Sequence, residues 1–251
     1  MLDIRFDHVV HYVNDPFEAM TAFKLLGFHT AKGGNHENWG TYNTLCYFKN
    51  LTYIEWIGIN NLEVTKEGSH PFSRHLYEDY KRGEGLSQIA FRTNSIDKTN
   101  QELTQKGIKT IGPLPGSRKR PDGTILKWSM LFIDHTRPMP FFIEWKGVDR
   151  IREQELNEIG VYVPDSKSIS FIAYAVKQPE NLADIWAKVL NGKVHISTLP
   201  GTEQKAFKVH FDTIDVYFSF KDHPRGERPF LVGIEPKATR AIILHGAKYL
   251  M

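Results

Sequence analysis

The sequence predicts an α+β fold built from tandem modules, each with one strand and one helix followed by three strands. Two phrases, Tyr53-Ile54-Glu55-Trp56 and Phe142-Ile143-Glu144-Trp145, place a carboxylate inside an aromatic and β-branched run, which is typical of a strand. Glycines that can end a helix recur at Gly27, Gly107 and Gly192, about 80 to 85 residues apart. This spacing indicates two complete modules and a third, partial one.

The first module is predicted over residues 1–67. Apolar residues alternate with polar ones in residues 3–13, which indicates a strand. Asn14-Asp15-Pro16 can begin the helix that follows, and Gly27 can end it. Three further strands are predicted at residues 28–32, 42–48 and 51–57, with a glycine-rich loop at 33–41.

The same order begins again after a polar connector at residues 68–83 and predicts a second module over 84–148. A strand at 86–93 comes first, and Ser95 can cap the helix that follows it. The remaining predicted elements are strands at 109–111, 125–133 and 141–145, with a basic, Pro/Gly-rich loop at 112–124.

A third, divergent module is predicted over residues 169–251, after a linker at 149–168. Its first strand carries Phe171 where the first module has His8, so we expect a structural role. Two modules complete a cup, and an odd third leaves a sheet face or edge uncovered. We therefore expect it to pack on the first pair or to meet its counterpart in a homodimer.

The composition is that of a soluble globular protein, with 41% hydrophobic residues and a formal net charge of +3. Such a small charge predicts no nucleic-acid partner, and no apolar run approaches the roughly 20 residues that span a bilayer. The N-terminus lacks the apolar core of a signal peptide, and Cys46 stands alone. We predict a cytoplasmic protein with a small-molecule partner and no membrane association.

Four side chains on corresponding predicted strands form a candidate metal site. His8 and Gln88 lie on the first strands of the two modules, and Glu55 and Glu144 lie on their last strands. Imidazole, amide and carboxylate ligands together suit zinc, nickel, manganese or iron. Gln88 is a weak ligand, so a site with two glutamates and one histidine, or an empty pocket with His8 in a structural role, is the alternative.

The chain resembles the glyoxalase-like domain family of the vicinal oxygen chelate superfamily, which includes glyoxalases, bleomycin-resistance proteins and dioxygenases. The residues that carry the resemblance are Gly33-Gly34-Asn35-His36, Gly40-Thr41-Tyr42-Asn43, Arg120-Pro121-Asp122-Gly123 and Pro140-Phe141-Phe142-Ile143-Glu144-Trp145. The resemblance implies two βαβββ modules paired into a cup over residues 1–148. It also implies that His8, Glu55, Gln88 and Glu144 bind a metal, and that Glu144 or Glu55 acts as the general base.

Several other residues are candidates for substrate contact. His36, in the glycine-flanked loop, can contact substrate or act as an acid or base, although a turn-stabilising hydrogen bond explains it equally well. Arg118 and Arg120 can clamp a carboxylate or phosphate, or can simply belong to a solvated basic loop. Asn43 and Trp128 complete the predicted substrate-binding set.

The sequence thus favours a metal-dependent lyase or isomerase that acts on a small carbonyl or vicinal-oxygen substrate. The metal would polarise the carbonyl, and a glutamate or His36 would move a proton. The alternative is a metal-free protein that binds and sequesters a small molecule in an aromatic-lined cup.

Overall fold

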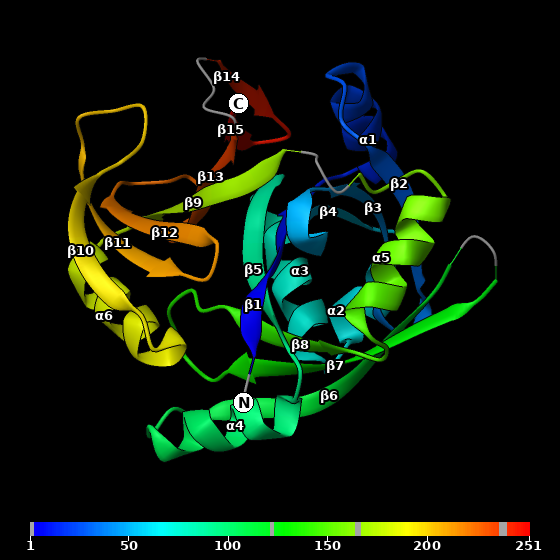
Figure 1. The fold of residues 1–251 in the computed structure, drawn as a ribbon, viewed down its shortest axis with the longest axis horizontal. Helices are drawn as coiled ribbons and strands as arrows, with labels where there is room; N and C mark the ends of the chain where they lie inside the picture. Colours follow the sequence, from blue (N-terminus) through cyan, green and yellow to red (C-terminus); the bar gives the residue numbers. More distant parts are fainter. Residues whose placement is uncertain (1–2, 121–122, 164–166, 236–239) are drawn as a thin grey trace.

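The computed structural model describes residues 3–120, 123–163, 167–235 and 240–251 (Figure 1). Its first eight strands close into a barrel in the order β1-β4-β3-β2-β6-β7-β8-β5. The bounds are β1 (Ile4–Tyr12), β2 (Thr30–His36), β3 (Thr41–Tyr47), β4 (Tyr53–Ile59), β5 (Gly85–Thr93), β6 (Thr110–Lys119), β7 (Ile125–Ile133) and β8 (Phe141–Trp145). The predicted α+β fold with two paired modules is confirmed.

Each half of the barrel has one helix between its first two strands, namely α1 (Pro16–Leu25) and α4 (Ile96–Gln105). Asp15 caps α1 by accepting from the Phe17 amide, and Ser95 caps α4. The halves join along β1 and β5, which pair from Ile4 to Tyr12, whereas β2 meets β6 only at Asn35 and Lys119. The junction between β2 and β6 therefore has less backbone pairing than the junction between β1 and β5.

Residues 68–83 do not form the polar connector expected from the sequence. They contain the whole of helix α3 (Pro71–Arg82), which follows α2 (Leu62–Glu67) and closes one end of the barrel. Phe72 and Leu76 are four residues apart, so both reach the inner apolar cluster from one helix face. His70 accepts a hydrogen bond from the Phe72 amide at the start of the helix.

The predicted basic loop at 112–124 was wrong in part, because β6 continues to Lys119 and pairs with β7. The Pro121-Asp122 pair of that loop lies outside the described residues. The predicted linker at 149–168 contains helix α5 (Asp149–Glu158), which lies beside β2 and β3 (Figure 1). Its side chains are mostly polar, which is why the sequence did not indicate a helix that covers the barrel wall.

The remaining strands form a second sheet of order β10-β11-β12-β9-β13-β15-β14. Its elements are β9 (Ser168–Val176), α6 (Pro179–Leu190), β10 (Lys193–Thr198), β11 (Lys205–Phe211), β12 (Ile214–Phe220), β13 (Arg228–Glu235), β14 (Ala241–Leu244) and β15 (Ala247–Leu250).

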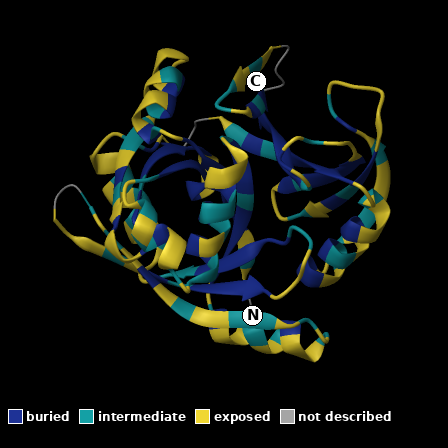
Figure 2. Ribbon diagram, turned by 180° about the vertical axis from the view of Figure 1, so that it is seen from behind, coloured by how far each residue is buried: buried dark blue, intermediate teal, exposed yellow. Residues whose placement is uncertain are grey.

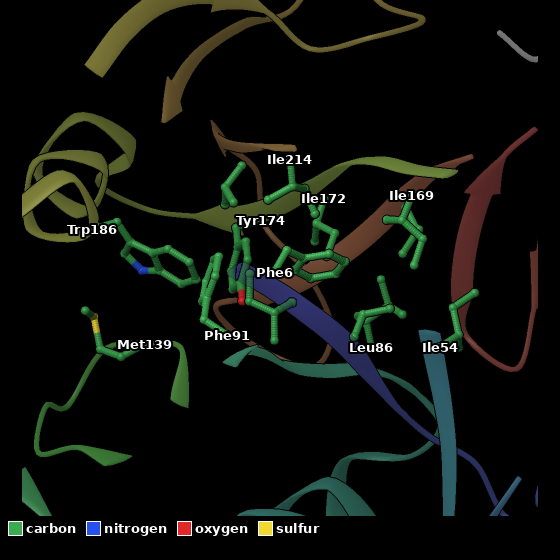
Figure 3. Packing of buried hydrophobic residues seen from close by; sticks show 14 of the residues in the cluster. Phe6, Ile54, Leu86, Phe91, Met139, Ile169, Ile172, Tyr174, Trp186 and Ile214 are labelled. Atoms are coloured by element: carbon green, nitrogen blue, oxygen red, sulfur yellow. The ribbon is translucent and has the colours of Figure 1, made fainter. Parts of the chain in front are cut away.

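This sheet packs on the outer face of β1 and β5, as the close view of the core shows (Figure 3). Phe91 of β5 lies edge-on to Trp186 of α6, with ring centroids 6.5 Å apart. Trp186 also donates from Nε1 to the Pro138 carbonyl over 3.0 Å. Buried residues run through both sheets, and exposed residues lie mainly on helices and loops (Figure 2). No helix in the described part of the chain is long and apolar enough to cross a membrane.

Candidate functional site

The barrel encloses an inner cavity of about 20 Å³, roughly the space of one water molecule. Strands from both halves contribute to its walls. Its polar lining consists of His8, His36, Asn43, Glu55 and Arg118, and its apolar lining of Trp39, Tyr53, Phe72, Trp128, Met130, Phe141, Ile143 and Trp145. Six of the residues singled out from the sequence therefore meet here: His8, His36, Asn43, Glu55, Arg118 and Trp128.

His8 and its chain neighbour Asp7 form a buried hydrogen-bonded pair, with His8 Nδ1 2.7 Å from Asp7 Oδ1. Consecutive residues of a regular strand face opposite sides, but the pairing of β1 with β5 shifts register between Phe6 and His8. A bulge of this kind re-aims a side chain, and it lets Asp7 reach the neighbouring imidazole. A carboxylate can only accept, so Nδ1–H donates and Nε2 remains free for other contacts.

Asp7 is held as a carboxylate by positive charge and hydrogen bonds. Trp145 Nε1 donates to Asp7 Oδ2 over 3.1 Å, and the guanidinium groups of Arg92 and Arg152 lie 3.7 Å from that oxygen. Burial raises the pKa of this fully buried carboxyl, but the His8 hydrogen bond and the two arginine charges outweigh that effect. The pKa of Asp7 therefore lies well below its usual range.

Glu55 faces the other side of the imidazole, with Oε2 3.6 Å from His8 Nε2. Its Oε1 accepts a hydrogen bond from Asn43 Nδ2. Asn43 Oδ1 accepts from Arg118 Nη1 and from the Gly34 amide, each over 3.0 Å, which fixes the orientation of the amide. A continuous polar chain thus runs from Asp7 through His8, Glu55 and Asn43 to Arg118.

Packing fixes the plane of the His8 ring. Tyr53 stacks on it with centroids 4.5 Å apart, and Phe141 lies edge-on at 5.6 Å. Gly33 allows Asn43 to approach closely, because a Cβ at Gly33 would overlap Asn43 Oδ1.

His36 lies at the end of β2 and forms part of the cavity wall. Its Nδ1 is 3.0 Å from Thr41 Oγ1, and its ring stacks on Trp39 with centroids 5.2 Å apart. Burial lowers the pKa of His36 to about 3, assisted by the nearby Arg118 charge. His36 is therefore neutral at neutral pH and can accept or donate a hydrogen bond there without carrying charge.

The buried neutral state of His36 predicts a pH dependence of stability. Its folded pKa lies below the ordinary histidine value of 6.5, so the unfolded chain takes up the proton first as the pH falls. Stability linked to His36 is present above pH 6.5 and is lost towards pH 3. Between pH 7 and pH 5 the expected loss is about 2 kcal/mol for this histidine.

Urea denaturation of His36→Gln at pH 7 and pH 5 checks this expectation. The variant should lose about 2 kcal/mol less than the parent protein over that interval. His29→Gln, at an exposed position, is the matched control and should retain the parent dependence. The same loss in His36→Gln and in the parent would contradict the expectation.

The structure does not bring Glu144 to His8 and Glu55. Glu144 points out of the barrel, where its Oε2 accepts from the Ile96 amide at the start of α4 over 2.9 Å. The strand register gives the physical reason. Val10 of β1 lies beside Glu55 in β4, whereas Ala90, 80 residues later, lies beside Phe141 in β8. Phe141 therefore occupies the position that corresponds to Glu55.

Gln88 also lies away from the inner cavity. It lines a separate cleft between the barrel and the second sheet, where its Oε1 is buried without a hydrogen-bond partner. Only His8 and Glu55 of the four predicted ligands approach each other, and no group of three or more His, Cys, Asp or Glu among the described residues is arranged to hold a metal ion. These residues do not fit the predicted divalent metal.

A larger space, the outer cleft, adjoins the inner cavity and has a volume of about 710 Å³. Tyr53, Arg118 and Trp145 line both spaces. The other residues that line the outer cleft are Thr30, Ala31, Lys32, Gly33, Leu45, Tyr47, Arg120, Thr124, Leu126, Arg152, Glu155, Leu156, Glu158, Ile159 and Val161. Arg120 is placed here rather than in the inner cavity and lies 3.4 Å from Glu155.

Sequence reasoning gave Asp7 and Arg152 no role, and it included Tyr53 and Trp145 only as aromatic members of the two repeated phrases. Strand alternation placed Asp7 opposite His8, and only the bulge brings the two side chains together. Arg152 belongs to a segment that looked like a linker. An Asp directly before a strand histidine was the one available signal, and it is weak alone.

The chain belongs to the glyoxalase-like domain family, whose model matches residues 6–190. The resemblance to the glyoxalase-like domain family is thereby confirmed. No curated protein matches the chain.

Two solved structures share the fold. One is a hypothetical protein from Staphylococcus aureus, with a TM-score of 0.83 and 21% identity, over 98% of each chain. Another is a triple variant of 4-hydroxymandelate synthase from Streptomyces coelicolor, with a TM-score of 0.61 and 10% identity, over 93% of this chain and 71% of the synthase. At these identities the similarity establishes the architecture alone.

Proposed function

We propose that the protein is an enzyme that moves a proton on a small carbonyl compound, with His8 as the base. The observation that carries this proposal is the buried Asp7–His8 pair, whose Nε2 faces Glu55 across 3.6 Å beside the inner cavity. A carboxylate behind Nδ1 fixes the ring and stabilises positive charge when Nε2 takes up a proton. Isomerases and lyases both use such a step.

The step balances as a simple transfer. A C–H bond next to the carbonyl breaks, its proton goes to His8 Nε2, and its electron pair moves to the carbonyl oxygen as an enolate. Arg118 supplies positive charge to the same cavity. The proton held on His8 Nε2 then returns to the product, either directly or through Glu55, whose Oε2 lies 3.6 Å away. This route differs from the metal-dependent reaction expected from the resemblance, because the residues present do not fit the metal.

Hydrogen exchange in deuterium oxide tests the proposal without a known substrate. A set of small carbonyl compounds with acidic neighbouring C–H groups is incubated with the protein and analysed by mass spectrometry. We expect deuterium to enter at least one compound, and His8→Gln to slow that exchange about 1,000-fold. Exchange that His8→Gln leaves unchanged would exclude His8 as the base.

A second candidate is a binding protein that sequesters a small molecule. The outer cleft of about 710 Å³ favours it, because a ligand could be held there without reaching His8. Tight ligand binding with no exchange in any carbonyl compound would support this candidate over the enzyme.

The proposal also covers the roles of the two parts of the chain. We propose that residues 1–148, together with the α5 residues that line the outer cleft, form the functional domain and that residues 169–251 form a structural module. A cytoplasmic location and a homodimer stay predictions from the sequence.

A further inference from the structure

We infer that the ligand of the outer cleft is an amphipathic anion, with a carboxylate or phosphate held between Arg118 and Arg152 and an apolar body beneath α5. The role of this ligand as a substrate rests on the proposed function. Its binding rests on the geometry of the outer cleft alone.

The first observation is a pair of unsatisfied guanidinium donors. Arg118 Nε and Arg152 Nη2 are buried, and each lacks a hydrogen-bond partner in the structure. Both residues line the outer cleft. A buried charged donor without an acceptor is unfavourable, so two of them in one cleft indicate a missing acceptor of opposite charge.

The existing contacts leave these donors free for a ligand. Arg118 uses Nη1 for Asn43, so its Nε side is available. Arg152 lies over the Trp145 ring at 5.0 Å. Its Nη2 faces two carboxylates, Asp7 Oδ2 at 3.7 Å and Asp149 Oδ1 at 3.8 Å, both beyond hydrogen-bond distance. A guanidinium offers a planar fork that matches a carboxylate or phosphate. Arg120, by contrast, already lies beside Glu155.

The charge balance of the cleft agrees with an anionic ligand. Four basic residues line it, Lys32, Arg118, Arg120 and Arg152, against two acidic ones, Glu155 and Glu158. One of the two acids pairs with Arg120. Asp7 and Asp149 also lie near Arg152, at 3.7 and 3.8 Å, and balance part of its charge. The excess of basic over acidic lining residues therefore favours an anion chiefly at Arg118, which donates to the neutral amide of Asn43 and also lines the inner cavity.

The rest of the cleft is apolar. Leu45 and Leu126 come from barrel strands, and Leu156, Ile159 and Val161 come from α5 and the residues after it. Tyr47 and Tyr53 belong to the same apolar cluster as Leu156. A ligand that places its charge at the arginines thus has its body against these side chains.

Calorimetric titration with four compounds of equal chain length tests the inference. Octanoate and octyl phosphate carry the anion, whereas 1-octanol and octylamine keep the apolar chain without it. We expect at least one anion to bind at least 10-fold more tightly than both controls. Which anion binds distinguishes a carboxylate ligand from a phosphate ligand.

Variants connect the binding to the arginines. Arg152→Gln and Arg118→Gln should each weaken binding of that anion at least 10-fold. Arg150→Gln, exposed on the same helix and outside the cleft, is the matched control and should change it less than 2-fold. Since the two variants come from different elements, a folding defect in one leaves the other as a test.

Binding of 1-octanol as tightly as the anions, no binding of either anion, or full affinity in both arginine variants would overturn the inference. His8→Gln should bind the anion within 3-fold of the parent protein. Failure of the proton-transfer proposal would therefore leave this binding intact, so the two failures are distinguishable.

Discussion

Replacement of Asp7 by Asn is expected to lower the free energy of unfolding by about 3 kcal/mol, as for the loss of one partner of a buried ion pair. Asp7 is fully buried and balances Arg92, whose side chain is 9% exposed, and Arg152, at 14%. Without the carboxylate these guanidinium groups keep their burial and lose their buried negative partner, and the half-exposed Asp149 remains beside them. The His8 ring also loses the charge that fixes it, so proton transfer should fall at least 100-fold.

Denaturation by urea at pH 7 measures the stability effect, and Asp149→Asn is the matched control. Asp149 contacts the same two arginines, 3.1 Å from Arg92 and 3.8 Å from Arg152, but its side chain is 47% exposed. Water screens that pair, so we expect a loss below about 1 kcal/mol. Equal losses of unfolding free energy in Asp7→Asn and Asp149→Asn would contradict a larger contribution from the buried carboxylate.

Replacement of Asp79 by Asn is expected to lower the free energy of unfolding by about 3 to 5 kcal/mol, because it leaves two buried guanidinium groups without their negative partner. Asp79 of α3 contacts Arg225 Nη2 at 2.9 Å and Arg228 Nη1, and both arginine side chains are 5% exposed. Ser87 also donates to this carboxylate. The cluster joins α3, at the end of the barrel, to Arg228 of β13 in the second sheet.

Glu78→Gln is the control for this second change. Glu78 is the preceding residue of α3, its side chain is 45% exposed, and it pairs with Lys81. We expect a loss below about 1 kcal/mol from this exposed pair. Urea denaturation followed by circular dichroism measures both variants. A loss below 1 kcal/mol in Asp79→Asn would contradict the view that this cluster fastens the second sheet to the barrel.

The repeated spacing of elements predicted the two modules, and the family resemblance implied their pairing, which the structure contains as a closed barrel. Gly27 and Gly107 end corresponding helices, and the 80 residues between them also relate Val10 to Ala90 in the sheet. His8 and Glu55 could be predicted as neighbours because they lie on the first and last strands of one module, which pair in parallel.

Likeness of local sequence was misleading for Glu144. Its phrase matches that of Glu55, but the register of β8 against β5 places Phe141 at the equivalent site. Register depends on pairing across the whole strand, and a shift by an odd number of residues sends a side chain to the other face. The alignment of the two phrases pairs Glu55 with Glu144, which is three residues beyond Phe141, the equivalent position in the sheet. The Glu144 carboxylate therefore faces the start of α4 and not the inner cavity.

The bulge beside Asp7 and helix α5 were not predicted from the sequence, and both omissions have physical causes. The bulge beside Asp7 arises from pairing between the two halves and leaves no pattern in β1 itself. Helix α5 is polar because it lies on the surface and is tied to the barrel by ion pairs such as Arg92–Asp149. Apolar periodicity, the main signal for a helix, is therefore absent from it.

Nitrogen-15 NMR of the His8 ring shows whether Asp7 fixes this ring with Nδ1 protonated, as the proposed role of Nε2 as the base requires. The His8 signals are assigned by comparison with His8→Gln in protein labelled at histidine. We expect a hydrogen on Nδ1 throughout the folded range of pH, lost or exchanging rapidly in Asp7→Asn and unchanged in Asp149→Asn. A hydrogen on Nε2 with a bare Nδ1, unaffected by Asp7→Asn, would contradict the account and remove His8 Nε2 as the base.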